Sequence, residues 1–157
     1  MILVTVGTHY QSFERLVKAA DEYAATTDER VVIQRGFTEY TCKHAECFDF
    51  CQKDRMSELL GEADVLVMQG GWGALRESID MGKRIVAVPR IEGVEHVHDQ
   101  EQIVRKLEEL GCVLAVYDIA DLPAKIEKAK TFAFKPLQHG SPQIIADTLE
   151  KWFPEKK

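Results

Sequence analysis

Short apolar runs rich in β-branched residues recur along the chain and alternate with segments whose apolar residues are spaced as in a helix. The predicted strands are residues 2–6, 30–34, 48–50, 64–68, 84–88 and 112–116. Because most of these runs are apolar throughout, both faces of their sheet should be buried, as in a parallel sheet. Repeated β–α units predict an α/β fold with a Rossmann-like, doubly wound and mainly parallel sheet.

The segments between the predicted strands should form helices that cover this sheet. The helical spacing predicts helices over residues 12–25, 54–63, 74–81, 103–110, 121–130 and 141–153. Ser12 and Asp54 are suitable N-cap residues, and Gly82 occupies the position of a C′ glycine. The last helix carries Trp152 and Phe153, so residues 143–153 are expected either to contact a partner or to pack on this domain's own sheet.

Length and charge limit the classes of protein to which the chain can belong. A chain of 157 residues can form a sizeable core, and we expect residues 1–157 to make a single domain. The net charge of −6 argues against a nucleic-acid-binding protein. No apolar run approaches the roughly 20 residues that span a bilayer, and no signal-peptide pattern follows the first strand. We therefore expect a cytoplasmic protein that reaches a membrane only through a partner.

The cysteines allow two interpretations. Without a secretory signal, the four cysteines are expected to be reduced thiols. Alternatively, Cys42, His44, Cys47 and Cys51 could form a zinc cluster, although their spacing lacks any CxxC pair.

The most informative turn of the chain contains Gly70, Gly71 and Gly73 between a predicted strand and a predicted helix. Such a turn leaves backbone N–H groups free at a helix N-terminus, where the helix dipole adds roughly half a positive charge. This arrangement suits a phosphate, whereas the alternative is an ordinary tight turn. Neither a full GxGxxG after the first strand nor a GxxxxGK[ST] motif is present, which argues against a dinucleotide site and a P-loop ATPase. A generic nucleotide- or flavin-binding module remains as a further alternative.

Three polar loops should meet at one edge of the sheet, since ligands of doubly wound sheets bind beyond the carboxyl ends of the strands. Their sequences are VTVGTH over residues 4–9, QGGWG over 69–73 followed by Glu77, and VPR over 88–90 followed by EHVHD over 95–99. In this order the segments resemble the family 28 glycosyltransferase C-terminal domain, the donor-binding half of a GT-B enzyme. The resemblance is greatest to small stand-alone subunits. These include bacterial exopolysaccharide glycosyltransferase subunits and the catalytic subunit of the N-glycan UDP-GlcNAc transferase.

The resemblance implies a UDP-sugar-dependent glycosyltransferase that needs no cofactor and no metal. Such a subunit transfers a hexose or N-acetylhexosamine to a lipid-linked acceptor in polysaccharide biosynthesis, together with a membrane-anchored Rossmann-like partner subunit. It also implies which residues bind the nucleotide-sugar: Gly7, Thr8, Gln69, Gly70, Gly71, Trp72, Gly73, Glu77, Arg90, His96, Asp99 and Gln100. Within that set Glu77 would bind the ribose, and His9 and Glu77 are the candidate catalytic residues.

Each of these assignments has a structural alternative. Glu77 could be a solvated acid in the first turn of a helix, and the loop of residues 7–9 a plain β–α turn. Arg90 could neutralise phosphate charge, face a partner, or be exposed without a function. His96 and His98 could hold a metal ion, bind the donor sugar, or be polar loop residues in water.

Three residues depart from the pattern of the family that the chain resembles. Gln69 stands where relatives usually have His, Trp72 where they have a small residue, and Glu101 where they have Gln. A glutamine can still donate and accept hydrogen bonds, but it cannot hold a proton as histidine can. These changes favour a second hypothesis, in which the chain is a non-catalytic partner subunit that keeps the fold without turnover.

Overall fold

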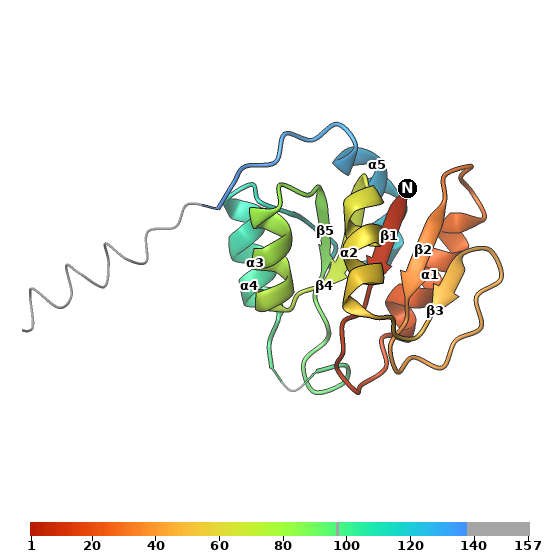
Figure 1. Cartoon of the computed structure of the whole chain (residues 1–157). Helices are drawn as coiled ribbons and strands as arrows, with labels where there is room; N and C mark the ends of the chain where they lie inside the picture. The colour runs from red at the N-terminus through yellow and green to blue at the C-terminus, as the bar shows by residue number, and fades with distance from the viewer. Residues whose placement is uncertain (97, 138–157) are drawn as a thin grey trace, which may run out of the picture.

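The computed structural model describes residues 1–96 and 98–137, which form a doubly wound α/β fold around one parallel sheet (Figure 1). The sheet has six strands in the order β3-β2-β1-β4-β5-β6, and all its pairs are parallel. The strands are β1 (Ile2–Thr5), β2 (Val31–Gln34), β3 (Glu46–Phe48), β4 (Val65–Gln69), β5 (Ile85–Val88) and β6 (Leu114–Ala115). The predicted fold class is confirmed.

Helices cover both faces of the sheet, as the largely apolar central strands require. The helices are α1 (Glu14–Ala24), α2 (Lys53–Glu62), α3 (Trp72–Asp80), α4 (Glu101–Glu109), the 3-10 helix η1 (Ile119–Asp121) and α5 (Leu122–Ala129). Residues of α1 and α5 pack against one face, and residues of α2, α3 and α4 pack against the other. Within β1 the side chains alternate, so Ile2 and Val4 join the first layer and Leu3 joins the second.

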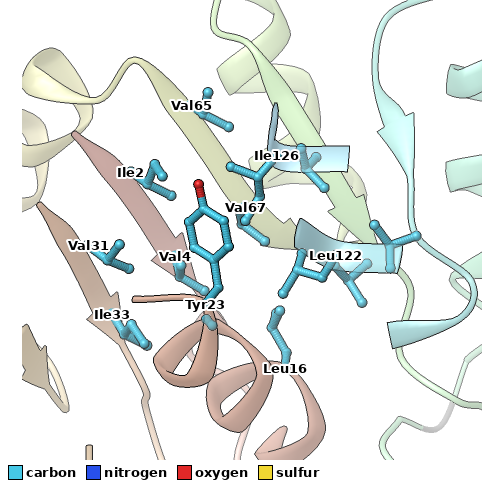
Figure 2. Packing of buried hydrophobic residues seen from close by; sticks show 14 of the residues in the cluster. Ile2, Val4, Leu16, Tyr23, Val31, Ile33, Val65, Val67, Leu122 and Ile126 are labelled. Atoms are coloured by element: carbon cyan, nitrogen blue, oxygen red, sulfur yellow. The ribbon is translucent and has the colours of Figure 1, made fainter. Parts of the chain in front are cut away.

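Figure 2 shows the core on the α1 and α5 side of the sheet. Leu16 and Tyr23 of α1 and Leu122 and Ile126 of α5 point toward aliphatic side chains of β1, β2 and β4. At the edge of this layer the Tyr23 hydroxyl of α1 donates a 2.6 Å hydrogen bond to Glu127 Oε1 of α5. The two helices are therefore fixed to each other as well as to the sheet.

The third strand begins earlier than the predicted range 48–50, and Asp21 gives the physical reason. The Asp21 carboxylate is 1% exposed and accepts hydrogen bonds of 2.9–3.1 Å from the backbone N–H groups of Lys43, His44 and Ala45. These bonds turn the chain so that it enters β3 at Glu46 and pairs with Val32. A carboxylate more than twenty residues upstream is not visible in a local strand pattern.

The same turn overturns the expectation of four reduced thiols. Cys42 and Cys47 form a disulfide across a Cα–Cα distance of 6.3 Å, while Cys51 and Cys112 are free. The zinc alternative loses two of its four ligands to that bond. Because Asp21 binds the backbone of residues 43–45, between the two cysteines, the conformation of this segment depends on tertiary structure and not on sequence spacing alone.

Two of the predicted helix caps are wrong and one terminus is confirmed. The N-cap of α1 is Phe13 instead of Ser12, and the Phe13 N–H donates a 2.9 Å hydrogen bond to Thr38 Oγ1. Asp54 lies in the first turn of α2, after the N-cap Gln52. Gly82 follows α3 with φ +69°, as a C′ glycine requires.

The predicted helix over residues 141–153, with its expected partner contact, lies outside the described residues. In the part of the chain that is described, no helix combines the length and apolarity that crossing a membrane demands.

Candidate functional site

The carboxyl ends of β1, β4 and β5 lie side by side, because these strands are neighbours in the sheet. The loops that follow them contain the three predicted segments, and β1 and β4 flank the point where the strand order reverses. Ligands of doubly wound sheets bind at this switch point. The candidate site is therefore built from the turn at Gly7, the turn at Gly70–Gly71 and the loop that starts at Arg90.

The turn after β1 is held in place by Gln34, a residue that sequence analysis did not select. Gln34 is 3% exposed, and its Oε1 accepts from Thr5 Oγ1 at 2.7 Å and from Gly7 N at 3.2 Å. Its Nε2 donates to Gly7 O and to Asp49 O, both at 3.0 Å. Gly7 has φ +75°, which only glycine adopts readily. The one available signal in the sequence is a glutamine at the carboxyl end of an otherwise apolar strand.

A second buried glutamine holds the turn after β4. Gln100 Oε1 accepts from Gly70 N at 3.0 Å and from Arg90 N at 3.1 Å. A Cβ at Gly70 would lie 2.8 Å from Val104 Cγ2 and 2.9 Å from Gln100 Cβ, so this position has no room for a side chain. Gly70 is therefore required by the protein's own packing, and Gln100 positions the turn from beneath.

The N-terminus of α3 provides backbone donors at this edge of the sheet. Gly71 is the N-cap residue, and no side chain caps the helix. The N–H groups of its first turn therefore lack intrahelical acceptors and combine with the positive end of the helix dipole. A Cβ at Gly71 would approach no atom closer than 3.6 Å, and at Gly73 it would meet nothing within 4 Å. These two glycines leave the approach to the helix N-terminus open.

Arg90 is buried in the structure, which corrects both the interpretation of an exposed side chain and its assignment as a phosphate ligand. It is 2% exposed, and its guanidinium lies over the Phe13 ring at 4.4 Å from the centroid. Its Nε and both Nη atoms donate to oxygen atoms of the protein at 2.6–3.2 Å. Burial lowers the pKa of Arg90 to about 10, so the side chain still carries its charge at neutral pH. Arg90 joins the three loops instead of facing a ligand.

Glu77 lines a cavity of about 280 Å³ between α2 and α3, which we call the α2–α3 cavity. The walls are mainly apolar and include Phe50, Met56, Leu60, Met68 and Met81, while Thr8 and Glu77 supply polar groups. Glu77 is exposed and lies one turn and a half into α3. A mainly apolar cavity with a carboxylate in its wall suits a heterocyclic base with an attached ribose.

A second cavity of about 770 Å³ opens on the other side of the α3 N-terminus, and we call it the histidine cavity. It is lined by His9, Gln69, Trp72, His96, His98 and Asp99, together with the two glycines of the turn. The rings of His9 and His96 are 4.5 Å apart between centroids, and those of His96 and His98 are 5.7 Å apart. Thr8 lines both cavities. The α3 N-terminus thus lies where the two cavities meet.

The protonation of His9 is set by its surroundings. Burial and the nearby His96, Arg90 and His98 lower the pKa of His9, so the imidazole is neutral at pH 7. Its Nδ1 accepts a hydrogen bond from Gln11 N at 3.3 Å, which leaves the ring proton on Nε2. His9 can therefore donate a hydrogen bond into the histidine cavity.

The three departures from the family pattern have different positions in the structure. Trp72 is 45% exposed in the wall of the histidine cavity, and Gln69 lies deeper in the same wall. Glu101 forms an ion pair with Arg105 on the surface of α4 and lines neither cavity. Its charge therefore lies outside these two cavities. Within residues 1–96 and 98–137, no group of three or more His, Cys, Asp or Glu side chains could hold a metal ion.

Comparison with known proteins places the chain in a family. The family model described as the glycosyltransferase family 28 C-terminal domain matches residues 1–147. No curated protein matches the chain. The match covers nearly the whole sequence, including all three loops of the candidate site.

Solved structures of low sequence identity share the fold. The glycosyltransferase of kitacinnamycin superposes with a TM-score of 0.65 and 21% identity over 83% of this chain and 34% of its own. MurG of Acinetobacter baumannii superposes with a TM-score of 0.59 and 15% identity, over 96% of this chain and 49% of its own. UDP-GlcNAc 2-epimerase of Neisseria meningitidis, bound to UDP-GlcNAc, superposes with a TM-score of 0.56 and 14% identity, over 96% of this chain and 43% of its own. The chain thus spans about a third to a half of the length of these proteins.

Proposed function

The chain belongs to the family of glycosyltransferase family 28 C-terminal domains, and from this membership we propose that it binds the UDP-sugar donor in a glycosyl transfer reaction. The transferred group is a hexose or an N-acetylhexosamine, and the acceptor is lipid-linked. The fold shared with MurG and with an epimerase bound to UDP-GlcNAc supports this assignment.

One observation carries the proposal: an uncapped helix N-terminus lies between an apolar cavity with a carboxylate and a larger cavity lined by three histidines. Backbone N–H groups at a helix N-terminus suit a diphosphate. With the diphosphate there, the uridine enters the α2–α3 cavity and Glu77 accepts hydrogen bonds from the ribose hydroxyls. The sugar then extends into the histidine cavity toward His96, Asp99 and Trp72.

The proposed reaction needs a stabilised leaving group. The acceptor hydroxyl attacks the anomeric carbon, the bond from that carbon to the β-phosphate oxygen breaks, and UDP leaves with the electron pair. Donors already aimed at the developing charge lower this barrier, and the α3 N-terminus and the neutral His9 can serve in this way. The acceptor proton passes to a base close to its hydroxyl.

The acceptor side of the reaction lies outside this domain in the proposal. The chain spans only a third to a half of the GT-B enzymes that it resembles, so it contributes one wall of a cleft. We propose that a membrane-anchored Rossmann-like subunit provides the other wall, and that the chain works in the cytoplasm at the membrane through that partner.

Calorimetric titration of the purified chain with UDP, ADP and FMN tests the donor assignment. UDP should bind more tightly than the other two, whereas preferential binding of FMN or equal binding of all three would refute it. Transfer from UDP-sugars is then measured with the partner present. If UDP binds but His9→Ala and Glu77→Ala leave transfer unchanged, the alternative of a non-catalytic subunit is favoured.

A further inference from the structure

The side-chain amide of Gln69 lies between the two glycine turns of the site. A Cβ at Gly71 would lie 3.6 Å from Gln69 Nε2, and a Cβ at Gly7 would clash with the same atom. Nε2 is thus in contact with the Gly7 backbone and lies next to the open side of Gly71. In the described part of the chain, this atom has no hydrogen-bond acceptor, and Gln69 lines the histidine cavity. Two N–H donors are therefore available where the proposed diphosphate lies.

The other end of the same amide is fixed by Arg90. Arg90 Nε donates a 2.6 Å hydrogen bond to Gln69 Oε1. A guanidinium has donors and no acceptor, so it can pair only with the oxygen of the amide. Rotation of the amide by half a turn would place the NH₂ group against Arg90 and the oxygen between the glycine turns. The arginine therefore determines which end of Gln69 faces the ligand.

Arg90 is itself held by two loops, the one after β1 and its own. Its Nη2 donates to Val6 O at 3.0 Å, and its Nη1 donates to Gln11 O and Ser12 O, both at 3.0 Å. Its own loop contributes Glu95 O at 3.2 Å. With the ring of Phe13 against its face, the guanidinium has little freedom to move.

We propose that Arg90 is a positioning residue, which holds Gln69 so that the Nε2 hydrogens face the diphosphate of the donor. The inference rests on the proposed function, because it assumes that a nucleoside diphosphate binds at the two glycine turns. In this role Gln69 donates hydrogen bonds to the anionic diphosphate and cannot lose its proton. In this chain, the donor at position 69 does not titrate, unlike the histidine that relatives usually carry there.

Gln69→Glu is the most direct test, because it replaces the NH₂ group with an oxygen atom and keeps the contact with Arg90. The carboxylate still accepts from Arg90 Nε, so the thermal midpoint should stay the same or rise. The donor between the glycine turns becomes a negative oxygen, so UDP should bind about 10- to 100-fold more weakly. Uridine, which lacks phosphates, should bind as it does to the wild type. Gln102→Glu on the exposed surface of α4 makes the same change in net charge and should leave UDP binding unchanged.

A double-mutant cycle separates positioning from a general structural role. Arg90→Lys removes the Nε donor and should weaken UDP binding about 10-fold in the wild-type background. In the Gln69→Ala background it should change UDP binding less than about 2-fold, because no amide remains to be positioned. Equal losses in both backgrounds would show that Arg90 acts on the whole site and would overturn the proposal.

The outcomes distinguish failure of the inference from failure of the proposed function. If the wild type binds neither UDP nor uridine, the proposed function fails. If the wild type binds UDP and Gln69→Glu binds it equally well, the assignment of Gln69 and Arg90 fails alone. If Arg90→Lys does not fold, the Gln69→Glu variant alone tests the proposal. Weaker binding of UDP with unchanged binding of uridine and an unchanged or higher thermal midpoint would support it, and any other result would overturn it.

Discussion

Gln34 Nε2 donates a 3.0 Å hydrogen bond to Gly7 O, and Gln34 Oε1 accepts one of 3.2 Å from Gly7 N. The side-chain amide thus pairs with the backbone of one residue through both its donor and its acceptor. Gln100 serves the second glycine turn in a related way, by accepting from the N–H of Gly70. Both turns of the candidate site are therefore rigid before any ligand binds, which lowers the entropy cost of binding.

Replacing Gln34 should loosen the first turn. Gln34→Met keeps the approximate volume but removes both hydrogen bonds to Gly7 and those to Thr5 and Asp49, which leaves Gly7 N with only the 3.3 Å bond to Thr5 Oγ1. The free energy of unfolding should fall by about 2–3 kcal/mol, and UDP should bind more weakly because the turn is no longer ordered. Urea unfolding and calorimetry measure the two effects. A variant as stable as the wild type would contradict this role.

Removing the carboxylate of Glu77 should weaken nucleoside binding in the α2–α3 cavity. Glu77→Ala should reduce the binding free energy of UDP by about 1.5–3 kcal/mol, the range for hydrogen bonds to a charged group. Uridine should lose a similar amount, since the ribose is common to both ligands. Glu109→Ala on the exposed surface of α4 is the matched control. Unchanged UDP affinity in Glu77→Ala would refute the ribose assignment.

The sequence predicts the fold because its signals are local. Short apolar runs such as residues 65–68 are typical of buried strands, and the parallel sheet follows from the helices between them. The cap at Ser12 and the start of β3 are wrong because tertiary hydrogen bonds decide them. Thr38 binds the N–H of Phe13, and Asp21 orders the segment before Glu46.

The candidate site is predicted to a lesser extent. The sequence predicts that the glycine turns and Glu77 lie where β4 leads into α3, because strand–glycine–helix transitions are visible in the sequence, and the structure has them there. The sequence does not predict the buried contacts of Gln34 and Arg90, since a polar residue beside an apolar strand is compatible with an exposed or a buried side chain. Only the packing of the loops around Arg90 reveals that it is buried and that its Nε and both Nη atoms donate to protein oxygen atoms.

The glycines of the second turn should differ in what they tolerate. Gly70→Ala should destabilise the fold, because the added Cβ meets Val104 and Gln100 at under 3 Å. Gly71→Val should stay folded by circular dichroism but lose UDP binding, since the close backbone approach to a phosphate requires glycine. Gly61→Ala, which meets nothing within 4 Å, is the control. Normal UDP affinity in a folded Gly71→Val variant would mean that the turn is only structural.

Donor binding should not require a divalent metal, because helix N–H groups and neutral side-chain donors can balance the phosphate charge. Protein dialysed against EDTA should bind UDP with the affinity of untreated protein. Titration of Mg²⁺ or Mn²⁺ into the EDTA-treated sample should leave that affinity unchanged. Loss of binding on chelation, with recovery on adding one of these ions, would refute the prediction.

Asp21 should make the stability of the fold depend on pH in the acid range. Burial raises the pKa of its carboxyl, but hydrogen bonds from Ala45, Lys43 and His44 outweigh this effect and hold the pKa below its usual value. A pKa that is lower in the folded state than in the unfolded state stabilises the protein at pH values above the unfolded pKa of about 3.9, and this contribution is lost as the pH falls further.

Asp21→Asn should therefore lower the free energy of unfolding by about 2–3 kcal/mol at pH 7. The difference from the wild type should shrink below about pH 4. Asp28→Asn, at an exposed site, should change stability little at either pH. Urea unfolding at both pH values checks this, and a difference between Asp21→Asn and wild type that does not vary with pH would show that the carboxylate is not what orders the segment before β3.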